Sequence, residues 1–116
     1  MRHSNANRKL GREKNQRRAL LRSLAVSLID KETIRTTTAK AKELRPFVEK
    51  VVTKAKSKTL SSRRYIVSYL NSEVAADKLI SVMADKYADR KGGYTRVVKA
   101  EPRKLDAAPM SVIQFV

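Results

Sequence analysis

The sequence predicts an α+β protein, a two-layer α/β domain in which one helix, one strand, three helices and two strands follow in order and the strands form a small mixed sheet. Three observations lead to this prediction. Apolar residues recur at helical spacing through most of residues 17–90, β-branched residues cluster at 33–37 and 94–99, and residues 110–116 alternate between apolar and polar. The 116 residues suit one core, so we expect a single α/β domain over 17–116 after a basic arm over 1–16.

The first helix and strand follow from spacing and side-chain shape. The apolar face of the helix is predicted to be Leu20, Leu21, Leu24, Ala25, Leu28 and Ile29. Residues 33–37 are mostly β-branched, which favours a pleated conformation and predicts a short strand.

The second helix is expected to begin at a Thr38 cap and to bury one stripe of its surface. That stripe is predicted to be Ala41, Leu44, Val48, Val51, Val52 and Ala55. Pro46 lies inside the pattern and lacks a backbone donor, so we expect it to kink or split the helix.

The remaining elements are bounded by polar residues and glycines. A short third helix is predicted over 63–70, and Asn71 or Ser72 is expected to cap a fourth. The buried face of the fourth helix is predicted to be Val74, Ala75, Leu79, Val82 and Met83. Gly92 and Gly93 are expected to end the helical region, before strands over 94–99 and 110–116.

The net charge of +16, from 27 Lys and Arg against 11 Asp and Glu, calls for a polyanionic partner. Its distribution is uneven. Residues 1–22 carry eight basic residues and one acid, whereas residues 65–89 carry two basic residues and four acids. Arginine dominates the arm, and its planar fork can bond two phosphate oxygens at once. We therefore expect the arm to contact nucleic acid, although a charge run is more often simply a solvated surface.

Aromatic, glycine and threonine residues leave alternatives open. Tyr65 and Tyr69, one helical turn apart, could stack on bases, although core packing is the more common use of such a pair. Tyr94 and Arg96 are predicted to share a strand face, where the tyrosine either stacks on a base or simply packs. The glycine pair could admit RNA backbone or form an ordinary turn. The threonines at 36–38 could bond phosphates, but strand formation and capping are the safer interpretation.

A catalytic or metal site is not indicated. The sequence has no cysteine, and its one histidine, His3, lies in the basic arm without a fixed partner. No phosphate-binding loop or metal-ligand cluster occurs, so we expect no enzyme activity, no cofactor and no small-molecule substrate. The polar start and the lack of a long apolar run predict a soluble, intracellular protein without a signal peptide or a membrane partner.

Several short motifs follow one another along the whole chain. They are Met1-Arg2-His3, residues 8–12, residues 17–22, Ser27-Leu28-Ile29, Thr36-Thr37 with residues 39–45, Arg63-Arg64, residues 92–96 and Ala108-Pro109-Met110. Together they resemble the L-seventeen family of bacterial large-subunit ribosomal proteins. Each motif is weak alone, but their joint order and spacing are specific. The resemblance implies a structural protein that binds large-subunit (23S) ribosomal RNA near the polypeptide exit region, beside neighbouring large-subunit proteins, on the cytoplasmic ribosome of a bacterium.

Charge and resemblance together give the residues expected to contact RNA. They are Arg2, His3, Arg8, Lys9, Arg12, Lys14, Arg17, Arg18, Arg22, Arg35, Thr36, Lys40, Lys42, Arg63, Arg64, Gly92, Gly93, Tyr94 and Arg96. The main rival hypothesis is a DNA-architectural protein, which would use similar charge but is expected to carry apolar wedges at a duplex-facing tip. The sequence offers no such tip, and an enzyme is the third hypothesis.

Overall fold

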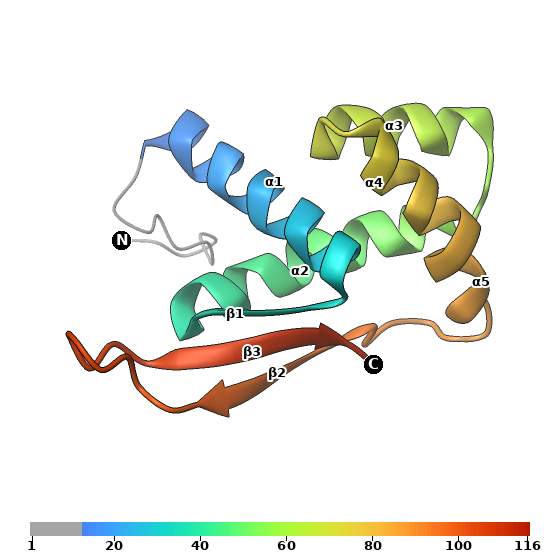
Figure 1. Cartoon of the computed structure of the whole chain (residues 1–116). Helices are drawn as coiled ribbons and strands as arrows, with labels where there is room; N and C mark the ends of the chain where they lie inside the picture. The colour runs from blue at the N-terminus through green and yellow to red at the C-terminus, as the bar shows by residue number, and fades with distance from the viewer. Residues whose placement is uncertain (1–12) are drawn as a thin grey trace, which may run out of the picture.

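A computed structural model describes residues 13–116 (Figure 1). Helix α1 (Lys14–Lys31), strand β1 (Thr33–Thr37), helix α2 (Thr38–Ala55) and helix α3 (Leu60–Leu70) are followed by one helical run, α4 (Glu73–Lys78), the π-helix η1 (Leu79–Met83) and α5 (Ala84–Lys86). Strands β2 (Thr95–Ala100) and β3 (Met110–Phe115) complete the chain. The structure is α+β, and this helical run occupies the place of the predicted fourth helix.

The three strands form an antiparallel sheet in the order β1-β3-β2. Ile113 of β3 is opposite Ile34 of β1 on one side and Val97 of β2 on the other. The prediction of a mixed sheet was therefore wrong. The last strand inserts between the other two and runs opposite to both, and a two-residue alternation identifies a strand without giving its direction.

Helix α2 holds the domain together. All helices lie on one face of the sheet, and α2 contacts α1, α3, η1 and all three strands (Figure 1). Its predicted stripe is confirmed, because these six side chains are fully buried: Ala41, Leu44, Val48, Val51, Val52 and Ala55. Of the predicted α1 face, Ala25, Leu28 and Ile29 are buried, whereas Leu21 and Leu24 pack at the edge of the core.

The structure corrects two details of helix ends and breaks. Pro46 lies within an unbroken α2, so of the two outcomes expected for it, a kink or a split, the split is excluded. The N-cap residue of α2 is Thr37 rather than the expected Thr38, and the Thr37 side chain makes no capping hydrogen bond. The Thr38 hydroxyl is bonded instead to the Ser111 hydroxyl of β3 at 2.8 Å. Helix α1 begins at Lys14, three residues before the start of its predicted pattern.

The later helices have well-defined N-caps. Thr59 and Ser62 form a capping box, which starts α3 at Leu60 rather than at Arg63. Ser72 caps α4 as expected, because its hydroxyl accepts the Ala75 N–H at 3.2 Å. Burial of Val74 and Val82 was predicted wrongly, since their side chains are 81% and 48% exposed. The wider π-turn changes the helical period at Val82, whereas Val74 lies in the first turn of α4, off its buried face. The buried face runs through Ala75, Ala76, Leu79, Met83 and Ala84.

Because α2 contacts every layer, shortening a side chain of its stripe should destabilise the whole domain. Replacing Leu44 by Ala is expected to lower the free energy of unfolding by about 2–5 kcal/mol, through lost burial and the cavity that remains. Leu105→Ala removes the same three carbon atoms from an exposed side chain and should change this free energy by less than about 0.5 kcal/mol. Chemical denaturation of both variants measures the difference, and equal losses would show that α2 does not organise the core.

Candidate nucleic-acid interface

Helix α1 carries three of the predicted arginines on its first half. Arg18 is exposed, and Arg17 and Arg22 are half-buried. The Arg22 guanidinium donates to the backbone oxygens of Tyr69 at 3.0 Å and Ser68 at 3.4 Å, so it fixes α1 to the end of α3. Arg22 therefore has a structural function that the sequence did not reveal. Lys14, also predicted to contact RNA, is exposed in the first turn of the helix.

The predicted residues of the arm are Arg2, His3, Arg8, Lys9 and Arg12, and they lie outside the described residues.

Arg35 and Arg96 lie on the same outer face of the sheet. Both are exposed, and they lie on the two edge strands on either side of β3. Arg35 is opposite Val112, whose other neighbour is Val98, while Arg96 is opposite Gln114, two residues along β3 and on the same face. None of the helices within residues 13–116 covers this face (Figure 1). It therefore offers one arginine on each edge strand, and the Arg35 guanidinium donates to the Glu101 carbonyl at 2.9 Å, beyond the end of β2 that lies away from Arg96.

The glycine pair and Tyr94 form the entry to β2. Gly93 adopts a φ of +61°, which side chains other than glycine rarely adopt, whereas a Cβ on Gly92 would meet open space. Tyr94 is only 1% exposed and precedes the strand. Of the two alternatives for Tyr94, packing is therefore the correct one and stacking on a base is wrong. Its ring packs against that of Tyr87, at 5.3 Å between centroids.

The Tyr94 hydroxyl is held by three polar groups. Thr53 and Lys56 donate to it at 3.4 Å and 3.2 Å, and it donates to the Arg90 carbonyl at 3.2 Å. Burial acts to raise the pKa of this hydroxyl, but the hydrogen bonds from Thr53 and Lys56 and the lysine charge outweigh it, so the pKa lies below its ordinary value. Tyr94 thus anchors the loop before β2 to helix α2.

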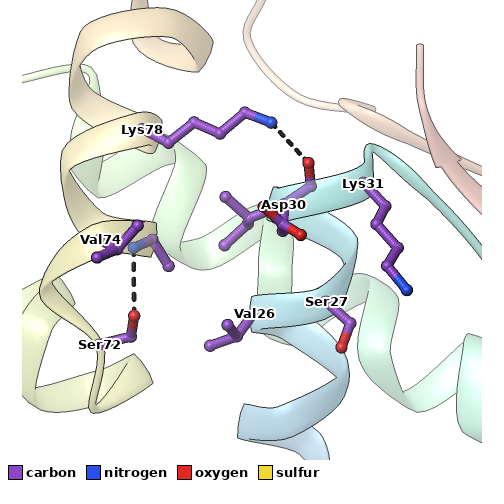
Figure 2. A pocket seen from close by; sticks show the side chains of 9 residues that line it. Val26, Ser27, Asp30, Lys31, Ser72, Val74 and Lys78 are labelled. Carbon is purple, nitrogen blue, oxygen red and sulfur yellow. Dashed lines mark hydrogen bonds between the residues drawn. The ribbon is translucent and has the colours of Figure 1, made fainter.

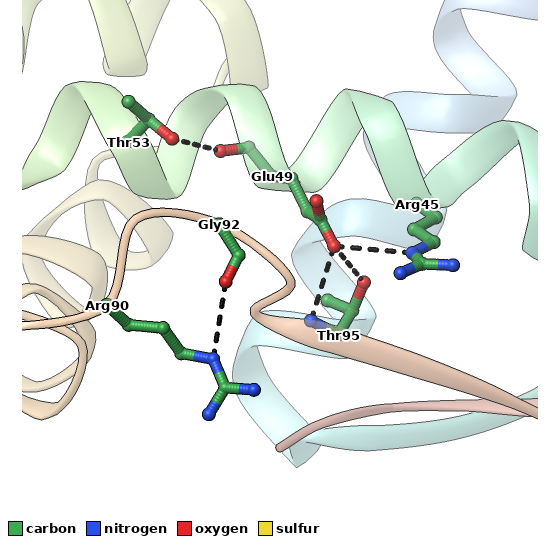
Figure 3. Close-up of polar contacts among 6 residues, drawn as sticks. All are labelled: Arg45, Glu49, Thr53, Arg90, Gly92 and Thr95. Atoms are coloured by element: carbon green, nitrogen blue, oxygen red, sulfur yellow. Dashed lines mark hydrogen bonds and ion pairs between the residues drawn. The ribbon is translucent and has the colours of Figure 1, made fainter.

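A second polar link, from Glu49 of α2, fixes the start of β2 (Figure 3). One carboxylate oxygen accepts the Thr95 hydroxyl at 2.8 Å, the Thr95 N–H at 3.4 Å and the Arg45 guanidinium at 3.3 Å. Arg90 stabilises the same loop by donating to the Gly92 carbonyl at 3.2 Å. Sequence reasoning missed Glu49, because its partner lies 46 residues away and no local pattern relates them.

The other predicted residues occupy separate places. Thr36 is buried in β1, which supports its reading as a strand residue. Lys42 and Arg64 are exposed, and Lys40 is half-buried near the start of α2. Arg63 forms an ion pair with Asp77 at 3.1 Å, which reduces the positive charge that it can offer to a phosphate.

A hollow between α1 and α4 has a different character (Figure 2). Apolar side chains such as Val26 and Val74 line it together with Lys31 and Asp30. Lys78 crosses its rim, where the ammonium donates to the Asp30 carbonyl at 2.9 Å and pairs with Glu32 at 3.6 Å. With acids and bases both present, this hollow is not a pronounced anion site.

Across residues 13–116, no group of three or more His, Cys, Asp or Glu side chains is arranged to hold a metal ion. None of the helices in that range is both long and apolar enough to cross a membrane.

The fold and its charge define a class, a small, strongly basic α+β protein whose exposed cations lie on helix faces and on an open sheet face. Residues 20–116 match the family described as Ribosomal protein L17. Proteins named large ribosomal subunit protein bL17 are similar over this entire chain. That of Gemmatimonas aurantiaca is 52% identical with 98% of its length covered, that of Orientia tsutsugamushi 50% with 80%, and that of Wolinella succinogenes 45% with 100%.

The chain therefore belongs to the ribosomal protein L17 family, which its motifs resemble. This is a family of structural ribosomal proteins, and the prediction that the chain is not an enzyme is confirmed by that membership.

The Glu49 link gives a direct test of how the entry to β2 is positioned. Glu49→Ala leaves the Thr95 hydroxyl and N–H, which are almost fully buried, without their acceptor, and should lower the free energy of unfolding by about 1–3 kcal/mol. Glu49→Gln keeps an acceptor oxygen, so its free energy of unfolding should fall by less than that of Glu49→Ala. Glu101→Ala, at an exposed site, serves as the control. Thermal melts compare the three variants, and an unchanged melt for Glu49→Ala would remove this link from the account.

Proposed function

We propose that this protein is a structural constituent of the bacterial large ribosomal subunit that binds and stabilises ribosomal RNA near the polypeptide exit region and so supports translation. The observation that carries the proposal is the similarity to large-subunit proteins over the whole chain, combined with a net charge of +16. A protein of this charge is most stable in its compact form when a polyanion offsets the self-repulsion. The exit-region location rests on the family resemblance.

The proposed contacts are electrostatic and involve several surfaces. The arm residues Arg2, His3, Arg8, Lys9 and Arg12 are proposed to bind phosphates, as are the exposed cations Lys14, Arg18, Lys42, Arg64, Arg35 and Arg96. Arg17, Lys40 and the backbone at Gly92 and Gly93 are proposed to lie beside them. Arginine forks bond two phosphate oxygens and hold a fixed orientation, which suits a protein that sets the spacing of RNA segments.

No chemical step is needed for this function. Phosphate contacts position a protein without reading bases, so recognition is expected to follow the shape of the RNA more than its sequence. By neutralising phosphates on two neighbouring RNA segments, the protein lowers their mutual repulsion and stabilises their packing. Neighbouring large-subunit proteins are proposed as further partners, again on the basis of the family.

The sheet face allows a test with matched single changes. If Arg35 and Arg96 each neutralise one phosphate, Arg35→Gln and Arg96→Gln should each flatten the logarithmic salt dependence of RNA affinity by about 1 unit. Lys86→Gln removes the same charge from a region of net negative charge and should leave the slope unchanged. Titration against large-subunit RNA fragments at several salt concentrations measures the slopes.

Two results would contradict the proposal. Equal slopes for all three variants would remove the sheet face from the RNA-binding surface. Equal competition by duplex DNA and by ribosomal RNA would favour a general nucleic-acid-binding protein instead.

A further inference from the structure

Three aromatic rings form a row across helices α2 and α3. Phe47 lies 4.5 Å from Tyr69 between ring centroids, and Tyr69 is stacked on Tyr65 at 5.5 Å with an interplanar angle of 19°. All three rings pack against the core, yet each residue is only half-buried. We call Phe47, Tyr69 and Tyr65 the aromatic row. Part of its surface is therefore open to a ligand.

Cations surround the aromatic row. The Lys54 ammonium lies 5.1 Å from the Tyr65 ring centroid, and the Lys50 ammonium lies 5.9 Å from that of Tyr69. These contacts are cation–π interactions, which are weak at exposed sites and leave the lysine side chains free to rearrange. A planar ligand that covers Tyr65 would displace Lys54 and leave its charge beside the ligand.

Three neighbouring hollows join the row and the cations into one surface. The first, of about 550 Å³, is lined by Lys50, Thr53, Lys54, Ser57 and Tyr65. The second is lined by Arg17, Leu21, Glu43, Pro46, Phe47, Lys50 and Tyr69, and the third by Arg18, Arg22, Phe47, Ser68 and Tyr69. Neighbouring hollows share lining residues, Lys50 in one case and Phe47 with Tyr69 in the other, so they lie side by side over α1, α2 and α3. We call the three together the basic aromatic groove.

The charge of the groove indicates the chemistry of its ligand. Its lining residues include five cations, Arg17, Arg18, Arg22, Lys50 and Lys54, and within the described chain the single acid among them is Glu43. The hollow between α1 and α4 instead has Asp30 with Lys31 and Lys78. A positively charged groove combined with partly exposed aromatic faces is typical of surfaces that bind single-stranded nucleic acid.

Packing alone accounts for part of this arrangement. The hydrogen bonds from Arg22 to the end of α3 already fix α1 there, and Phe47 and Tyr69 fill the junction between α2 and α3. The hydroxyls of the hollow beside Tyr65 are likewise used internally, since Thr53 donates to the Glu49 carbonyl at 3.0 Å and Ser57 to the Lys54 carbonyl at 2.9 Å. Packing does not account for two exposed lysines beside a half-buried ring in that hollow. The ring and the lysines match a nucleotide, since the ring suits a base and the lysines suit phosphates.

We propose that the basic aromatic groove binds an unpaired segment of ribosomal RNA, with one base stacked on Tyr65 and the adjoining phosphates held by Lys50 and Lys54. Within an RNA helix the faces of the bases are covered by their neighbours, so only a base outside the stack can cover the ring. The inference rests on the proposed RNA-binding function and deepens it. It adds a site for an unpaired base to a surface that otherwise contacts phosphates.

The test uses the full-length protein and a single-stranded RNA oligonucleotide of about ten nucleotides that carries the fluorescent base 2-aminopurine. Stacking on Tyr65 should quench the fluorescence when the wild-type protein binds. Tyr65→Leu keeps an apolar contact to Tyr69 but removes the stacking face, and should weaken binding about tenfold or more and abolish the quenching. Tyr65→Phe keeps the face and should behave like the wild type, while thermal melts check the fold of each variant.

Lysine variants and competing polyanions separate the contribution of charge from that of base stacking. Lys50→Gln with Lys54→Gln should flatten the salt dependence of oligonucleotide binding by about 1 to 2 units while the remaining bound complex stays quenched. Wild-type protein that binds the oligonucleotide without quenching would overturn the inference, as would equal affinity of Tyr65→Leu and Tyr65→Phe. Displacement of the RNA by polyglutamate as readily as by unlabelled RNA would identify a general anion groove and overturn it too.

A parallel titration against large-subunit RNA keeps the two proposals distinct. If the wild type binds that RNA tightly but shows no quenching or no effect of Tyr65→Leu with the oligonucleotide, the groove is not a base-binding site and the proposed function stands. If the wild type does not bind large-subunit RNA, the proposed function itself fails.

Discussion

Burial of one helix between the sheet and the other helices is the constraint on which this structure depends. The apolar stripe of α2 is fully buried, and α2 contacts every strand as well as α1, α3 and η1. A helix that meets partners on so much of its surface has little room for charge there, so its cations lie along the remaining exposed strip. The core thereby determines where positive charge can lie on α2. Lys42, Lys50 and Lys54 all lie on its exposed side.

The same constraint separates two basic surfaces with different geometry. The sheet offers Arg35 and Arg96 on a flat face without a helix, whereas α1, α2 and α3 offer cations around a row of aromatic rings. A flat face with separated arginines suits the phosphates of a regular RNA helix, and a groove with rings suits RNA whose bases are unpaired. A structural protein that contacts both kinds of RNA can hold a junction between them.

Periodicity predicted what depends on local sequence and missed what depends on distant partners. The α2 stripe and the Ser72 cap were predicted correctly, because helical spacing and capping are local effects. The antiparallel sheet, the burial of Tyr94 and the Glu49 link to Thr95 arise from contacts between residues far apart in the chain. The basic aromatic groove was likewise beyond sequence reasoning, since Phe47 and the α1 arginines reach Tyr69 only through the packing of three helices.

The central claim, that the basic helical surface lies against ribosomal RNA, can be tested by comparing the reactivity of lysines in the free protein and in the intact large subunit. An amine-reactive reagent followed by mass spectrometry reports each lysine separately. We expect Lys42, Lys50 and Lys54 to become strongly protected in the subunit, whereas Lys86, in the acidic stretch of the chain, should stay as reactive as in the free protein. Protection of Lys86 with Lys50 and Lys54 still fully reactive would contradict it.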